Sequence, residues 1–200
     1  MTKLLKKQKY KFALLYLDKD EKYLRFNMPY TLEQADILID LANQRLYLPK
    51  LKKHYQISSG KNGIGEQENT GKTPRGWHRV AEKFGHDVPK NTVFVARQPT
   101  GEIYHLQLAN LFPQRDWILS RILWLDGLEE GFNKGDGCDT FKRYIYIHGT
   151  PDIEPMGVPM SHGCIRMHND DVIELFELIP TQALVYISAQ EFEIKSLKDK

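Results

Sequence analysis

The chain contains 200 residues, of which 41% are hydrophobic and 27% are charged. These fractions are close to the globular average, so they exclude wholesale disorder, a collagen-like repeat and a coiled coil, and the length fits one domain. The formal net charge of +2 is too small to provide a broad electrostatic surface for nucleic acid. The two cysteines, Cys138 and Cys164, are too few for a disulfide scaffold.

The start of the sequence carries five lysines in eleven residues, followed by a short apolar stretch at residues 12–17. That stretch is shorter than the apolar core of a secretory signal, and no small-residue cleavage site follows it. We therefore expect a cytoplasmic protein, or a periplasmic one if a signal has been trimmed from the sequence. A run of 18 or more apolar residues is missing from the sequence, so we expect no membrane span.

Segments rich in β-branched and aromatic residues recur along the chain and predict strands. Residues 1–30 form an N-terminal appendage, with a hairpin expected from strands at 10–17 and 22–26. The catalytic domain is expected at residues 31–190, with strands at 37–41, 44–48, 54–58, 92–96, 103–106, 117–125, 143–148 and 184–188. The glycine-rich residues 58–76 predict a long surface loop of functional importance, and residues 191–200 predict a solvated tail.

One amphipathic helix is predicted near the C-terminus, capped at its start by Asn169. Its apolar residues recur at i, i+3, i+4 and i+7, namely Val172, Leu175, Phe176 and Ile179. The predicted fold class is therefore mainly β, or α+β at most: a single domain with a sandwich or barrel-like sheet and one C-terminal helix.

The strongest chemical signal combines His148, at the end of an apolar strand, with Cys164. A cysteine attacks as the thiolate, and a nearby imidazole accepts the thiol proton and later returns it to the leaving group. Gly149 and Gly163 adjoin these two residues, and glycine permits the close approach and sharp turn that let backbone amides point at a developing oxyanion. The pattern predicts a cysteine nucleophile with a histidine base.

The sequence SHGCIRM at residues 161–167, after the strand-borne His148, resembles the signature of L,D-transpeptidases of the YkuD type. The resemblance extends over roughly residues 36–188 and includes the loop at 71–76 and the closing helix. It implies that Cys164 is the nucleophile and His148 the base, with the Gly149 carbonyl orienting the imidazole. It also implies that His162 lines the catalytic site and that the Gly163 and Cys164 amides form the oxyanion hole.

Ser161 and Arg166 are expected to bind substrate, because a guanidinium fork suits a carboxylate. The resemblance implies acyl transfer, through a thioester, at the bond between the L-centre of diaminopimelate and D-alanine in peptidoglycan stem tetrapeptides. It implies muropeptides as partners, carbapenems as covalent inhibitors and no cofactor. Water as the acceptor would give an L,D-carboxypeptidase of cytoplasmic wall recycling, which the expected location favours. An amine acceptor would give a transpeptidase that forms cross-links or exchanges D-amino acids.

Other classes of function are weighed beside this one. A zinc site built from His148, His162 and Cys164 lacks a fourth ligand and the usual ligand spacing, so no metal is expected. Residues 71–73 do not form a phosphate-binding loop, because Glu66 stands where that loop requires glycine. A module that binds muropeptides without turnover remains the non-catalytic alternative.

Overall fold

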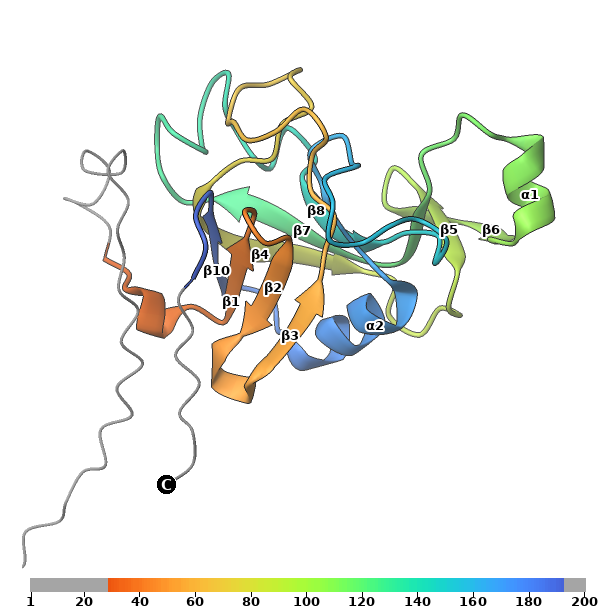
Figure 1. Cartoon of the computed structure of the whole chain (residues 1–200), viewed down its shortest axis with the longest axis horizontal. Helices are drawn as coiled ribbons and strands as arrows, with labels where there is room; N and C mark the ends of the chain where they lie inside the picture. The colour runs from red at the N-terminus through yellow and green to blue at the C-terminus, as the bar shows by residue number, and fades with distance from the viewer. Residues whose placement is uncertain (1–28, 193–200) are drawn as a thin grey trace, which may run out of the picture.

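The computed structural model describes residues 29–192, so the hairpin expected at 10–17 and 22–26 lies outside the described residues (Figure 1). The described strands are β1 (Ile37–Asp40), β2 (Arg45–Leu48), β3 (Lys53–Gln56), β4 (Gly76–Phe84), β5 (Thr92–Val95), β6 (Gln98–Ile103), β7 (Ile118–Gly127), β8 (Tyr146–Gly149), β9 (Ile165–Met167) and β10 (Leu184–Ser188). The helices are α1 (Leu106–Leu111) and α2 (Asn169–Leu178), with short 3-10 turns at Leu32–Gln34 and Pro49–Leu51. Within residues 29–192 we find no helix that combines the length and the apolar character needed to cross a membrane.

The strands form a single sheet in the order β3-β2-β1-β10-β4-β7-β5-β6, with a branch at β7. β7 pairs with β4 and β5 along one edge and with β8 along the other, and β8 then pairs in parallel with β9. The pairings of β7 with β4 and with β8 are both interrupted by register shifts, which increase local twist and bend a sheet. The branch places β8 beside β7, the longest described strand, and β9 beside β8.

Both faces of the sheet are covered. α2 packs its buried Val172, Leu175 and Phe176 against one face, in a core that includes Leu123 of β7 and Ile147 of β8 (Figure 1). The opposite face near β1 and β10 carries a second cluster that includes Trp77 and Tyr186. Successive strand residues face opposite sides of the sheet, and both sides are covered. All four residues of β1 and all four of β8 are therefore buried.

The prediction of a mainly β fold with a C-terminal helix is confirmed. Seven of the eight strands expected in the main domain match observed strands, but the strand expected at 103–106 is wrong: it shares only Ile103 with β6, and α1 begins at Leu106. The central strand β4 was not predicted. β4 carries charged residues, which are unusual in a central strand. One of them, Lys83, is accommodated because it donates to the carbonyls of Phe176 and Ile179 at the end of α2, at 2.6 and 2.8 Å.

The cap of α2 differs from the expectation. His168 occupies the N-cap position and Asn169 is the first helical residue, with its side chain buried. Asn169 instead donates from Nδ2 to the Thr150 carbonyl at 2.7 Å, and its Oδ1 accepts from the Ser120 hydroxyl at 2.6 Å. Asn169 therefore ties the start of α2 to the end of β8 and to β7.

Candidate active site

The registers of β8 and β9 place the predicted nucleophile and base on one face of the sheet. His148 pairs with Arg166, and Ile147 pairs with Ile165. Ile147 and Ile165 both face the α2 core, so by alternation Cys164, Arg166 and His148 face the other way. Cys164 packs there against the cluster of Trp124 and Tyr146. Because His148 pairs with Arg166, Cys164 is its diagonal neighbour on this face of the sheet.

The buried imidazole of His148 is fixed by a backbone carbonyl. Its Nδ1 lies 2.8 Å from the Gly149 oxygen, which can only accept, so Nδ1 carries the hydrogen and Nε2 keeps its lone pair. Burial lowers the pKa of His148 to about 4, against the opposing effects of the Gly149 carbonyl and Asp116. At neutral pH the ring is therefore uncharged and able to accept a proton at Nε2.

Gly149 is required at its position by close packing. A Cβ there would lie 2.6 Å from both Asn169 Oδ1 and the Leu119 carbonyl oxygen. The residue that follows the base therefore has room for no side chain, which keeps its carbonyl beside the His148 ring.

The half-buried Cys164 rests as a protonated thiol. The Tyr146 amide donates to Sγ at 3.4 Å, and the thiol donates to the Tyr144 carbonyl at 3.4 Å. Burial raises the pKa of Cys164 to about 12, although the Tyr146 amide and two nearby guanidinium groups act in the opposite direction. The resting pair of Cys164 and His148 is thus neutral on both sides.

The loop that presents Cys164 is held from within by Ser161. The buried Ser161 hydroxyl donates to the Cys164 carbonyl at 2.5 Å and accepts from the Gly163 amide at 3.1 Å. Gly163 has φ of 119°, a conformation that favours glycine. The Ser161 hydroxyl therefore contacts its own loop and occupies the Gly163 amide, while the Ser161 backbone bonds to Ser59 and Lys61. The substrate-binding role of Ser161 and the oxyanion role of Gly163 stay predictions.

Arg166 and His162 share a partner that the sequence did not indicate. Asp116, between α1 and β7, accepts from Arg166 Nη2 at 2.7 Å and lies 3.3 Å from His162 Nδ1. Burial acts to raise the pKa of Asp116, but Arg166, His148 and His162 outweigh it and hold the pKa below its usual value. Asp116, His162 and Arg166 line a pocket together with Thr150 and Glu154. The only sequence signal for Asp116 is an acidic residue directly before a predicted strand, which carries no information on contacts across the sheet.

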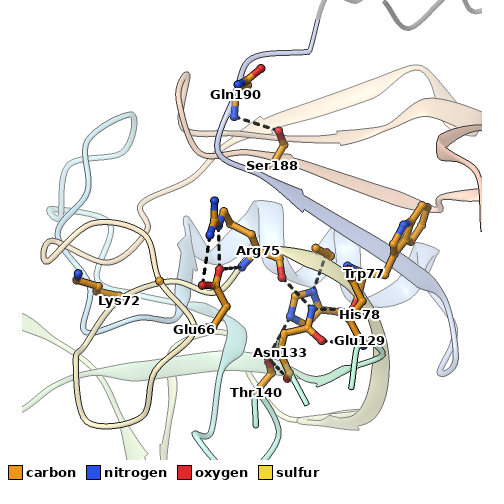
Figure 2. Close-up of polar contacts among 12 residues, drawn as sticks. Glu66, Lys72, Arg75, Trp77, His78, Glu129, Asn133, Thr140, Ser188 and Gln190 are labelled. Atoms are coloured by element: carbon orange, nitrogen blue, oxygen red, sulfur yellow. Dashed lines mark hydrogen bonds and ion pairs between the residues drawn. The ribbon is translucent and has the colours of Figure 1, made fainter. Parts of the chain in front are cut away.

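The long loop predicted at 58–76 braces the segment that carries Cys164. The Thr73 hydroxyl donates to the Gly163 carbonyl at 3.0 Å, and Arg143 donates to the carbonyls of Glu66 and Lys72 at 2.7 and 2.5 Å. Figure 2 shows Arg75 facing Glu66 within this loop, with a shortest contact of 2.8 Å.

A second buried histidine lies where this loop enters β4. His78 places Nδ1 3.0 Å from the Gly76 carbonyl and Nε2 3.1 Å from the Thr140 hydroxyl, and Asn133 lies beside it (Figure 2). Burial lowers the pKa of His78 to about 4. His78 therefore belongs to the packing between β4 and the 129–140 segment, away from Cys164.

In residues 29–192 we find no group of three or more His, Cys, Asp and Glu side chains arranged to hold a metal ion. A cysteine directly before one strand and a neutral imidazole on the neighbouring strand are the groups used in nucleophilic acyl transfer.

Comparison with known proteins places the chain in a family. Residues 34–187 match the family model of the YkuD L,D-transpeptidase catalytic domain. Over 67 residues the chain is 42% identical to YqjB of Bacillus subtilis strain 168, named as an L,D-transpeptidase, covering 32% of this chain and 38% of that protein. Over 47 residues it is 47% identical to YkuD of the same strain, covering 24% of this chain and 29% of that protein. The aligned parts thus span less than half the length of these two relatives.

A crystal structure of L,D-transpeptidase 3 from Mycobacterium tuberculosis, in complex with a faropenem-derived adduct, aligns with a TM-score of 0.44 and 14% identity. The alignment covers 78% of this chain and 59% of that chain. Because the family match extends over most of the described residues, the chain belongs to the YkuD L,D-transpeptidase catalytic domain family, a family of enzymes.

Proposed function

We propose that the protein is a cysteine acyltransferase that cleaves the bond between the L-centre of diaminopimelate and D-alanine in peptidoglycan stem tetrapeptides. The observation that carries this proposal is the register of β8 and β9, which places Cys164 and His148 on one face of the sheet, with Nδ1 of His148 fixed by the Gly149 carbonyl at 2.8 Å. Membership in the L,D-transpeptidase family supports the choice of substrate.

In the proposed reaction Sγ of Cys164 forms a bond to the scissile carbonyl carbon while its proton moves to Nε2 of His148. The carbon–nitrogen bond then breaks, and His148 returns the proton to the leaving amine of D-alanine. An acceptor then attacks the remaining thioester while His148 takes its proton, the carbon–sulfur bond breaks, and His148 returns the proton to Sγ of Cys164. Backbone amides at the Cys164 loop are the proposed donors to the tetrahedral oxyanion.

Water is the acceptor that we propose first, which makes the protein an L,D-carboxypeptidase of cytoplasmic muropeptide recycling. This version follows the expected cytoplasmic location. An amine acceptor, giving cross-links or D-amino acid exchange, uses the same thioester and is the second candidate. The strained acyl carbon of a carbapenem would react with the same thiol, so we expect a mass adduct that Cys164→Ala abolishes.

The test is mass spectrometry of the products from a diaminopimelate tetrapeptide ending in D-alanine, with Cys164→Ala as the matched control. Tripeptide alone, dependent on Cys164, is the result expected of a carboxypeptidase. Dimers, or exchange with an added D-amino acid, would identify a transpeptidase. Binding of the tetrapeptide without any Cys164-dependent product would contradict the proposal and favour the non-catalytic binding module.

A further inference from the structure

The guanidinium of Arg97 lies on an aromatic platform beside the nucleophile. Its Cζ is 4.4 Å from the centroid of the Trp124 ring and 5.2 Å from that of Tyr144, and its Nη1 donates to the Tyr146 hydroxyl at 2.9 Å. Tyr144 and Tyr146 are the residues whose backbone contacts the sulfur of Cys164. Arg97 and the thiol therefore share the same two neighbours.

Arg97 carries an unneutralised charge. In the part of the chain that the structure describes, its guanidinium contacts are the two rings and the phenol, and none is a carboxylate. Arg166, the arginine expected to bind substrate, is already paired with Asp116 at 2.7 Å and lies 3.9 Å from Glu154. A substrate carboxylate would have to compete with Asp116 at Arg166, whereas at Arg97 it would find a free charge.

The two arginines lie at opposite ends of the nucleophile. Cys164 comes directly before β9 and Arg166 lies within it, and the pocket of Asp116 and Arg166 lies toward the carboxyl ends of β8 and β9. Arg97 lies at the other end, against Tyr144, which precedes β8. A substrate lying along these strands would pass over Cys164 with one end at each arginine.

The backbone holds this platform in uncommon conformations. Ala96 and Arg97 form the two-residue turn between β5 and β6 with φ of 47° and 68°, a pair of left-handed values that usually requires Asn and Gly. Tyr144 has φ of 56°, which is rare for a bulky residue, and the residue is 54% exposed. Left-handed residues of this kind persist where the surrounding structure fixes them and cluster at functional sites.

We propose that Arg97, supported by Trp124 and Tyr144, binds a carboxylate of the substrate and so determines specificity for acidic stem peptides. The inference rests on the proposed function for the identity of the substrate, but the charge and geometry of the subsite do not depend on it. The carboxylate belongs either to the terminal D-alanine or to the side chain of diaminopimelate, and both have the chemistry that a guanidinium recognises.

The first experiment compares kcat/KM for the tetrapeptide and for two amidated forms, one blocked at the terminal carboxylate and one at the diaminopimelate side chain. The wild-type protein is expected to prefer the free acid by about tenfold or more over one amide, and Arg97→Gln to lose that preference. Arg97→Lys keeps the charge without the planar fork and should retain part of it. Arg45→Gln, which removes an exposed arginine from the distant strand β2, is the matched control and should keep all of it. The amide that loses activity identifies the carboxylate.

The second experiment needs no peptide. Cys164 is alkylated with iodoacetate, which carries a carboxylate, and with neutral iodoacetamide, and Cys138 on the same chain provides the internal reference. The rate with iodoacetate divided by the rate with iodoacetamide is expected to fall at least about twofold at Cys164 in Arg97→Gln. The same ratio at Cys138 should stay constant. Thermal unfolding of each variant confirms that the fold is intact.

The two readouts separate the possible failures. If the wild-type protein turns over the peptides and Arg97→Gln keeps the full preference for the acid, the role of Arg97 is refuted while the proposed function stands. If no variant turns over any peptide, the alkylation ratio decides: a fall supports the carboxylate subsite without the proposed function, and an unchanged ratio overturns both.

Discussion

The resting state of the nucleophile gives a prediction that separates two mechanisms of cysteine catalysis. In one mechanism the thiolate and imidazolium exist as an ion pair before substrate arrives, and in the other both groups are neutral. Burial raises the pKa of Cys164 to about 12 and lowers that of His148 to about 4, so the structure corresponds to the neutral pair.

The expected thiolate population follows from the pKa of Cys164. At pH 7 a pKa of about 12 leaves roughly one thiolate in 10⁵ molecules, whereas an ordinary cysteine has a few per cent. Between pH 6 and 9.5 the rate of alkylation at Cys164 by iodoacetamide should therefore rise about tenfold for each pH unit, without a plateau. Peptide mapping by mass spectrometry separates Cys164 from Cys138.

The His148→Gln variant is the control for this experiment. With a neutral resting pair it should keep the same dependence of rate on pH, because no imidazolium lowers the thiol pKa in the wild-type protein. Rapid alkylation of the wild-type protein with a rate that is flat from pH 5 upward, abolished in His148→Gln, would refute the neutral pair and indicate a preformed ion pair.

Three other changes test the surroundings of the site. Asp116→Asn removes a charge that raises the pKa of Cys164, so alkylation at pH 8 should become severalfold faster, while loss of the ion pair to the buried Arg166 should lower the unfolding free energy by about 1–3 kcal/mol in a urea titration. Gly149→Ala places a methyl group 2.6 Å from Asn169 Oδ1 and should reduce the unfolding free energy by about 1–3 kcal/mol, and an unchanged urea midpoint would contradict that packing. The pKa of His78 is lowered in the folded protein to about 4, so its contribution to stability is complete above about pH 6.5 and is lost as pH falls toward 4, by up to about 1.4 kcal/mol per pH unit. Urea titrations at pH 7 and 5 should show this loss, and His78→Gln should show less of it.

The sequence predicted those elements whose residues repeat in a local pattern. The strands with alternating or continuous apolar residues and the amphipathic helix α2 were found within a few residues. β4 was missed because its charged residues mask the strand pattern, and their compensation comes from distant partners: Arg79 pairs with Asp126 on β7 at 2.7 Å. Contacts of that kind are set by sheet order, which a local pattern does not encode.

The same limit applies to the site. The positions of Cys164 and His148 were indicated by their motif and by the strand before it. Asp116 and Arg97 were not, because each acts across the sheet from a segment with no motif of its own. Asn169 was predicted as a helix cap because asparagine is common at that position. In the structure its side-chain amide instead joins the start of α2 to Thr150 and Ser120.

Backbone carbonyls, rather than carboxylates, hold both protons of the resting pair. The Gly149 oxygen accepts from Nδ1 of His148, and the Tyr144 oxygen accepts from the thiol of Cys164. A carbonyl fixes orientation as a carboxylate does, but it carries no net charge to favour an imidazolium. Asp116, whose carboxylate acts electrostatically on both groups, is already engaged by the Arg166 guanidinium. In the proposed reaction His148 therefore stays uncharged until it takes the proton of the attacking thiol, which couples ionisation of Cys164 to the arrival of the acyl carbon.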